Sequence, residues 1–273
     1  MIRLCVRVAR DDAGVVLSEL LELSPAGVEE RETSDGVEYV IYGAAGELPQ
    51  IEEVEAAAAS GPLVSVSSSE IPDDWAERWK VWHRPVDVSW RFKRLRVRPP
   101  WEAALGDDEV TEIVVDPGQA FGTGAHATTR LCLELLLGLE PEGALADWGC
   151  GTGVLAIAAA RLGWSPVTAV DNDPAAIDAT RENAAVNGVA LDVGLANLRD
   201  APGPWAPVVC ANLVRPLLLD VARLMDEPPR HLIASGLLRE EADEVAAAFA
   251  VRGLVERHRR HCAEWSALAL SVA

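Results

Sequence analysis

The sequence Asp-Trp-Gly-Cys-Gly-Thr-Gly at residues 147–153 constrains the fold of this chain more than any other stretch. Residues 143–146 before it are short and apolar enough for a buried strand. Residues 154–162 after it favour a helix, because they contain neither proline nor glycine. A strand, a glycine turn and a helix in this order open a nucleotide pocket in α/β sheets, since glycines allow a tight turn and the close approach of a ligand to the helix start. The stretch therefore predicts an α/β fold with a nucleotide-type ligand at this turn.

The glycine spacing and a downstream carboxylate narrow the class of ligand. A dinucleotide fingerprint, G-x-G-x-x-G, needs glycine at position 154, where Val154 stands. The chain instead has G-x-G-x-G, formed by Gly149, Gly151 and Gly153. A second predicted strand, residues 167–170, ends in Asp171, at about the distance where an acidic residue reaches ribose hydroxyls. Together these features predict an adenosine-type ligand held by its ribose.

Composition excludes several classes of protein. The chain has 273 residues, 49% of them hydrophobic, and its longest apolar runs are far shorter than the roughly 18 residues of a membrane span. It begins in a strand-like alternation with no signal-peptide core. Five cysteines without a C-x-x-C pair indicate reduced thiols in a cytoplasmic protein and no metal site. A net charge of −19 argues against direct binding of nucleic acid.

Residues 1–68 are predicted to form a small α+β substrate-recognition domain. Their pattern gives a β-α-β-β-α-β order, that of a ferredoxin-like module, with strands and helices expected at residues 4–8, 15–21, 28–32, 37–42, 49–59 and 63–66. Residues 1–70 hold 14 acidic residues and 4 arginines. Such a surface can attract a basic partner, for example a ribosomal protein, or can simply keep the protein in solution. No cluster of catalytic residue types occurs there, so recognition or spacing is the predicted role.

Residues 69–103 are predicted to be a tryptophan-rich linker helix followed by connecting strands. Trp75, Trp79 and Trp82 recur at helical spacing, which indicates packing of the helix onto a flanking domain or a role in delivering a substrate. The basic residues from Arg91 to Arg98 alternate imperfectly with apolar ones. This pattern favours a strand with one solvent-exposed face over an RNA-binding segment.

Residues 104–273 are predicted to form the catalytic domain. Its entry is the loop Asp116–Thr129, between a strand at residues 110–115 and a helix at residues 131–137. The loop is rich in Gly, Thr and Asp and would present hydroxyl and backbone N–H groups at a helix start. Its His126 could act as a base or could hydrogen-bond the loop together. Further elements are expected at residues 175–186, 208–211, 217–225, 231–234, 240–252, 255–261 and 265–272, the last two as a closing hairpin.

Several of these segments together resemble one family. The loop Asp116–Thr129, the block Asp147–Gly153, the strand end at Asp171 and the segment Asn212–Leu217 are similar to the PrmA family, methyltransferases of the bacterial large-subunit ribosomal protein eleven. Residues 74–80 and Ser235–Leu238 resemble it too, and the resemblance covers residues 70–240. It implies a Rossmann-like class I methyltransferase domain, with a mostly parallel seven-stranded sheet and a terminal antiparallel hairpin, preceded by the ferredoxin-like domain.

The resemblance also implies the site. Carried over by position, its cofactor contacts fall on Thr129, Gly149, Asp171 and Asn212, and the complete predicted cofactor set adds Gly151, Gly153, Phe121 and Thr123. Asn212 and His126 are the predicted catalytic residues, Asn212 accepting an N–H of the acceptor amine and His126 positioning the loop. The family pattern is broken at Ala125, Ala127 and Arg215, which leaves the identity and extent of acceptor methylation open.

The predicted function is transfer of methyl groups from S-adenosyl-L-methionine to amino groups, the N-terminal α-amino group and lysine side chains, of ribosomal large-subunit protein eleven. The product would be S-adenosylhomocysteine, and no metal is expected. A small-molecule amine or another protein is the alternative acceptor. Two other classes compete: an NAD-dependent oxidoreductase, disfavoured by the missing third glycine, and a non-catalytic scaffold that keeps the fold.

Overall fold

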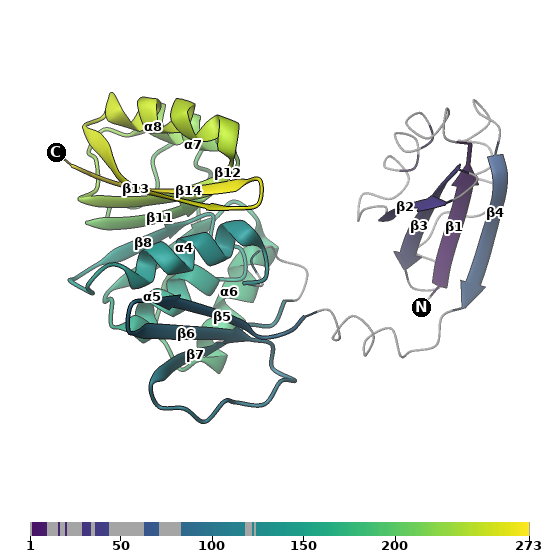
Figure 1. The fold of residues 1–273 in the computed structure, drawn as a ribbon, viewed down its shortest axis with the longest axis horizontal. Helices are drawn as coiled ribbons and strands as arrows, with labels where there is room; N and C mark the ends of the chain where they lie inside the picture. The colour runs from purple at the N-terminus through teal and green to yellow at the C-terminus, as the bar shows by residue number, and fades with distance from the viewer. Residues whose placement is uncertain are drawn as a thin grey trace. The chain divides into compact units, whose positions relative to one another are not determined.

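The computed structural model describes residues 2–9, 16, 20, 29–33, 36–43, 63–70, 83–117, 122 and 124–272. The chain divides into two compact units, residues 1–82 and 83–273 (Figure 1). The division falls inside the segment 69–103 that the sequence predicts to be a linker. The predicted tryptophan helix and the predicted helix at residues 49–59 lie outside the described residues.

The N-terminal unit contains one antiparallel sheet of four described strands. These are β1 (Ile2–Val8), β2 (Glu29–Thr33), β3 (Gly36–Gly43) and β4 (Leu63–Glu70), in the order β2-β3-β1-β4. This order, with β1 and β3 central, fits the predicted β-α-β-β-α-β module. Leu4, Val6 and Val8 of β1 form an apolar cluster with the helical, buried Val16 and Leu20. The unit therefore has a hydrophobic core of its own.

The C-terminal unit is organised around a seven-stranded sheet with the order β10-β9-β8-β11-β12-β14-β13. Its strands are β8 (Leu145–Trp148), β9 (Val167–Asp171), β10 (Asp192–Leu195), β11 (Val208–Asn212), β12 (His231–Leu238), β13 (Leu254–Cys262) and β14 (Trp265–Val272). Strands β8 to β12 run parallel to one another, whereas β14 runs antiparallel to both β12 and β13. The predicted fold class, including the terminal antiparallel hairpin, is confirmed.

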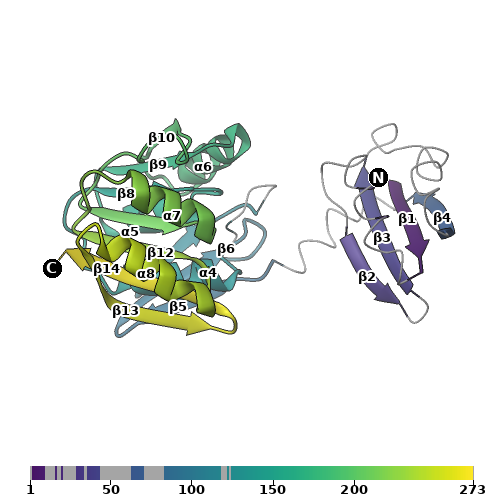
Figure 2. The same ribbon diagram turned by 90° about the horizontal axis from the view of Figure 1, so that it is seen from above.

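Helices cover both faces of this sheet (Figures 1 and 2). One face carries α4 (Ala127–Leu137), α5 (Val154–Leu162) and α6 (Pro174–Val186), and the other carries α7 (Arg215–Leu224) and α8 (Ala242–Ala250), which follows the 3₁₀ turn η4 (Arg239–Glu241). Each face buries a separate apolar cluster. Strands covered on both sides read as continuous apolar runs, as in residues 208–211. Among the helices that the structure describes, none has the length and hydrophobicity of a membrane span.

A second sheet of three strands, β5 (Val86–Trp90), β6 (Lys93–Arg98) and β7 (Val110–Val114), packs on α4 and α5. The predicted strand at residues 91–98 is in fact a turn, Arg91-Phe92, followed by β6, and the Phe92 side chain is 97% exposed. One face of β6 is accessible to solvent, as predicted. Its arginines pair with carboxylates across the sheet and its loop, Arg96 with Asp87 and Arg98 with Glu112. Pairing within the unit explains this basic strand without RNA.

Several predicted boundaries shift, each for a physical reason. The strand predicted at residues 143–146 lies at Leu145–Trp148 instead, because both Asp147 and Trp148 are buried in it despite their polar atoms. The helix predicted from residue 131 starts at Ala127, where His126 caps it. Strand β10 was not predicted, since its residues are half-exposed and include a glycine.

Candidate active site

The glycine turn follows β8 and closes over the end of β9. The backbone N–H groups of Gly149 and Cys150 both donate to the Val170 carbonyl, at 2.8 and 3.0 Å. Gly149, Gly151 and Gly153 have φ of 77°, 55° and 80°, a region that residues with a Cβ rarely adopt. Space is short as well, because a Cβ on Gly149 would lie 2.3 Å from Leu213 Cδ2. The turn needs glycine for conformation and for packing.

Asp171 stands at the carboxyl end of β9, directly beside the turn. Its Oδ2 accepts the Gly151 N–H at 3.0 Å, and its Oδ1 accepts the Asp173 N–H at 3.1 Å. Each carboxylate oxygen carries two lone pairs, so both can accept a further hydrogen bond from a ligand hydroxyl. The protein therefore fixes the carboxylate while leaving it able to bind a ribose.

Asp147, the acid that precedes the turn, is fully buried at the end of β8. Its Oδ2 accepts the Ala156 N–H of α5 at 3.0 Å, whereas its Oδ1 has no hydrogen-bond partner among the described residues. Burial raises the pKa of Asp147 to about 7, against the opposing effect of the Ala156 N–H. The turn thus rests on a carboxyl group with one unpaired oxygen.

Asn212 and Thr129 meet across the sheet edge. Asn212 ends β11, and its Nδ2 donates to the Oγ1 of Thr129 at 3.3 Å. Thr129 is buried in the first turn of α4, a helix that His126 caps by accepting the Thr128 N–H at Nδ1. The His126 ring also packs edge-on against Trp265, with centroids 4.9 Å apart. In this position His126 holds the start of α4, and α4 holds Thr129 against Asn212.

A cavity of about 280 Å³ opens beside these groups. Four predicted residues line it: Gly149, Gly151, Asp171 and Asn212. Of the other predicted residues, Gly153 is the N-cap of α5. Thr129 contacts Asn212, which lines the cavity, and His126 caps α4, the helix that contains Thr129. Phe121 and Thr123 lie outside the described residues. The loop 116–129 is tied to the turn at Gly122, whose carbonyl accepts the Thr152 hydroxyl at 2.6 Å.

The same cavity is lined by residues that were not among the predicted site residues. They are Asn172, Ala196, Asn197, Leu198, Arg199, Leu213, Val214 and Leu217. Residues 196–199 follow β10, and ligands in open α/β sheets bind beyond the carboxyl ends of the strands. Recognition of β10 in the sequence would have placed this loop at the site.

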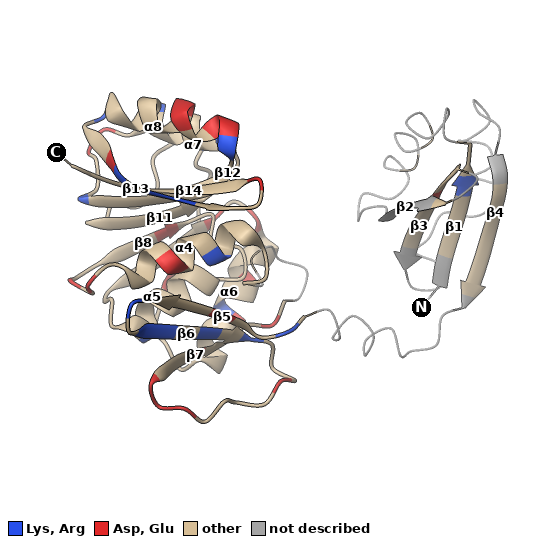
Figure 3. Cartoon of the chain, in the orientation of Figure 1, with Lys and Arg blue, Asp and Glu red and all other residues tan. Residues whose placement is uncertain are grey.

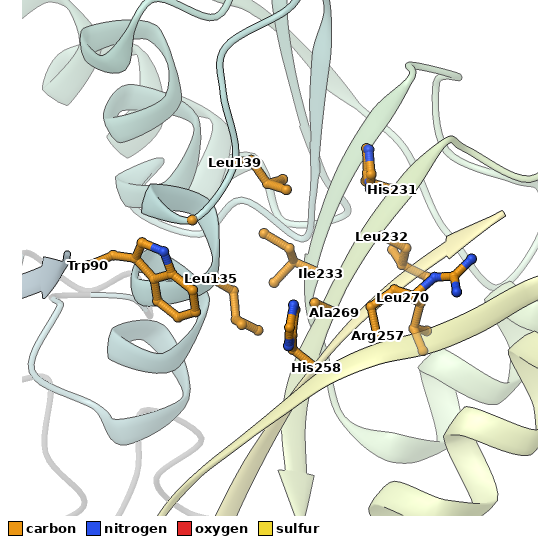
Figure 4. Close-up of a pocket in the computed structure, with 11 residues that line it drawn as sticks. Trp90, Leu135, Leu139, His231, Leu232, Ile233, Arg257, His258, Ala269 and Leu270 are labelled. Atoms are coloured by element: carbon orange, nitrogen blue, oxygen red, sulfur yellow. The ribbon is translucent and has the colours of Figure 1, made fainter. Parts of the chain in front are cut away.

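Figure 4 shows a second cavity, of about 220 Å³. Trp90, Leu135, Leu139 and Ile233 form its apolar walls, and the His258 ring points into it in Figure 4. His231, at its rim, begins β12, whereas Asn212 ends the neighbouring strand. This cavity has no glycine turn and no carboxylate among its lining residues, so it does not meet the requirements for the adenosine-type ligand.

The sheet order, the glycine turn after β8 and the carboxylate after β9 define the class of protein: it is an S-adenosylmethionine-dependent methyltransferase with the class I, Rossmann-like fold. The family described as "Ribosomal protein L11 methyltransferase (PrmA)" matches residues 20–272, and the chain belongs to this family.

Individual relatives agree with the family match. The chain is 39% identical to "Ribosomal protein L11 methyltransferase" of Symbiobacterium thermophilum over 202 residues, which cover 72% of this chain and 65% of that protein. The protein of the same name from Pelotomaculum thermopropionicum is 39% identical over 259 residues, 89% of this chain and 82% of its own length. The crystal structure of "ribosomal protein L11 methylase" from Lactobacillus delbrueckii subsp. bulgaricus superimposes with a TM-score of 0.59 at 29% identity, covering 68% of this chain and 98% of that one.

Proposed function

We propose that the protein transfers methyl groups to amino groups of ribosomal protein L11, both the N-terminal α-amino group and lysine side chains. The observation that carries this proposal is the Asn212 amide, which lies at the carboxyl end of β11 and lines the same cavity as the glycine turn and Asp171. The names of the relatives support L11 as the acceptor. Such a protein would act in the cytoplasm, where ribosomal proteins are made.

The residues of the cavity fit S-adenosylmethionine as the methyl donor. Asp171 keeps lone pairs for the two ribose hydroxyls, and the backbone at Gly149 and Gly151 lines the cavity without side chains. When bound, this cofactor supplies an electrophilic methyl group on a positively charged sulfur, so the protein has mainly to align a nucleophile and exclude water.

Asn212 would orient the acceptor amine. Its Nδ2 is directed to Thr129, so its Oδ1 faces away from that contact and can accept an N–H of the amine. An amine is nucleophilic only without its extra proton. An α-amino group, with a pKa of about 8, loses this proton readily. A lysine side chain, with a pKa of about 10.4, needs a less polar or more positive environment to lose it near neutral pH. We assign His126 a positioning role, because its Nδ1 caps the helix that holds Thr129.

We further propose that residues 1–68 form the domain that recognises the acceptor and that residues 69–103 connect it to the catalytic domain at residues 104–273. The first 70 residues carry a net charge of −10, from 14 acidic residues and 4 arginines. A surface of this sign attracts a basic protein through long-range electrostatics. The unit also has its own core, so it can present such a surface independently of the methyltransferase unit.

Intact-mass measurement tests the proposal. The protein is incubated with S-adenosylmethionine and either free L11 or ribosomes, and each transferred methyl group adds about 14 Da to L11. The comparison of free L11 with ribosomes also identifies which form is the acceptor. An L11 mass that stays unchanged in both reactions, under conditions where the protein binds the cofactor, would exclude L11 as acceptor. A panel of small amines would then test the alternative.

A further inference from the structure

Three charged side chains form a cluster where α7 meets the start of α8. Arg215, the first residue of α7, places its Nε 3.2 Å from Glu241 Oε1 and its Nη1 2.7 Å from Glu244 Oε2. Glu241 is held in turn by the Leu238 N–H, which donates to its Oε2 at 2.8 Å. The acidic start of α8 is visible in Figure 3. With one positive and two negative groups, the cluster has a net charge of −1.

This cluster lies beside the mouth of the cofactor cavity. Val214, the residue before Arg215, lines that cavity, and Asn212 is only three residues away. Three residues span at most about 11 Å, so the Arg215 backbone lies within this distance of Asn212. The intervening loop is fixed, because the Leu213 N–H donates to the Ser235 carbonyl at 3.0 Å. Arg215 therefore begins α7 next to a residue that lines the cavity, and its guanidinium is held there by Glu241 and Glu244.

We propose that Arg215 favours the deprotonated, nucleophilic form of the acceptor amine, compared with the same cluster without Arg215, by offsetting part of the negative charge of Glu241 and Glu244. This inference rests on the proposed function of the site. A cation disfavours a second cation nearby, whereas an unopposed pair of carboxylates would stabilise an ammonium group. Arg215 then acts through its charge, in addition to linking α7 to the start of α8 through its ion pairs.

Other charges around the mouth make the field negative without Arg215. Besides Arg215, the described residues with a formal charge on α7, on the adjoining η4 and α8, and among the residues that line the cavity are Asp171, Arg199, Asp220, Arg223, Arg239, Glu240, Glu241, Asp243 and Glu244. Arg259 is already engaged by Asp243 and Glu256. At about 10 Å and an effective dielectric constant between about 20 and 80, one unit charge shifts the protonation of a neighbouring amine by roughly 0.3 to 1 pH unit.

The experiment measures kcat and kcat/KM for L11 methylation from about pH 6.5 to about pH 10, a range that brackets amine titration. Arg215→Gln changes the net charge of the cluster from −1 to −2, and its pH–rate profile should move to higher pH by roughly 0.3 to 1 unit. The double variant Arg215→Gln/Glu244→Gln restores the net charge of −1 while removing the tie between the helices. Its profile should return to that of the wild type, and Arg215→Lys should match the wild type as well.

The outcomes distinguish an electrostatic role of Arg215 from a purely structural one. An unshifted profile for Arg215→Gln overturns the inference. Equal impairment of the single and double variants also overturns it, because the role of Arg215 would then be only structural. Thermal unfolding and cofactor binding of each variant check that the fold is intact. Failure of the proposed function is separate, since wild-type protein would then leave the mass of L11 unchanged at every pH.

Discussion

At the scale of single residues, Asp147 gives the protein an unusual dependence of stability on pH. Burial raises its pKa from 3.8 to about 7 in the folded state. A carboxyl group with a raised folded pKa stabilises the fold fully below its unfolded pKa, and this stabilisation is lost as the pH rises to the folded pKa. Asp147 therefore opposes folding at neutral pH, where ionisation would place a charge in the core.

Replacement of Asp147 by Asn should remove this dependence. Between about pH 4 and about pH 7 the wild type should lose up to about 4 kcal/mol of unfolding free energy relative to Asp147→Asn, as three pKa units imply. Urea unfolding without cofactor across this range measures the difference, and the effects of other carboxyl groups cancel in the comparison. Parallel profiles for the two proteins would show that Asp147 is not buried in the way described.

Asn212 and Asn172 line the same cavity, but replacing each by alanine should have different effects on turnover and on cofactor affinity. Asn212→Ala removes the carbonyl proposed to orient the amine, so we expect turnover to fall about 10²-fold with little change in affinity for S-adenosylhomocysteine. Asn172 follows Asp171 on the proposed ribose side, and Asn172→Ala should weaken cofactor binding more than turnover. Calorimetry and steady-state rates measure the two quantities. An equal loss of both for Asn212→Ala would make it a cofactor ligand only.

At the scale of elements, the glycine turn depends on its contact with the loop after β11. A methyl group on Gly149 would lie 2.3 Å from Leu213 Cδ2, at a φ of 77°. Gly149→Ala should destabilise the protein by about 2–4 kcal/mol, from backbone strain together with overpacking, and should weaken cofactor binding. Gly188→Ala is the matched control, because its φ is 63° with nothing within 4 Å. Urea unfolding should show only the smaller strain cost there, and equal losses would exclude the packing contribution.

Helix α6 holds the turn and the entry loop through Asn183. This buried side chain donates to the Thr152 carbonyl at 3.0 Å and accepts the Asp116 N–H at 2.9 Å. Asn183→Leu leaves both backbone groups without this partner, so we expect a loss of about 2–5 kcal/mol in urea unfolding. Glu182→Ala, on the exposed side of the same helix, should stay within about 0.5 kcal/mol of the wild type. A similar small effect for Asn183→Leu would contradict the proposed tie.

The sequence was informative where local chemistry decides the structure. The turn glycines and Asp171 were predicted because backbone conformation and charge are written in single residues. Strand β10 escaped prediction because its stability comes from pairing with β9, which no local pattern reveals. For the same reason residues 196–199 were not placed at the site. The hydrogen bond between Asn212 and Thr129 could not be predicted from local sequence either, because 83 residues separate the two along the chain.

At the scale of the whole molecule, charge is distributed unevenly between the units. Residues 1–70 carry a net charge of −10 of the total −19, in about a quarter of the chain. If this surface attracts a basic acceptor, methylation of L11 should weaken as salt is added, since the screening length falls from about 10 Å at 0.1 M to about 3 Å at 1 M. Affinity for the cofactor, bound in the other unit, should change much less.

Separation of the two units tests the division of labour directly. Residues 83–273 contain all the described residues that line the cofactor cavity and two apolar clusters, so this fragment should fold and bind S-adenosylhomocysteine with the affinity of the full chain. Without the acidic unit, kcat/KM for L11 should fall by at least about tenfold, the equivalent of about 1.4 kcal/mol of acceptor binding. Calorimetry and intact-mass kinetics compare the fragment with the full chain. A fragment that methylates L11 as fast as the full chain would contradict the assignment of recognition to the N-terminal unit, because the catalytic unit alone would then select its acceptor.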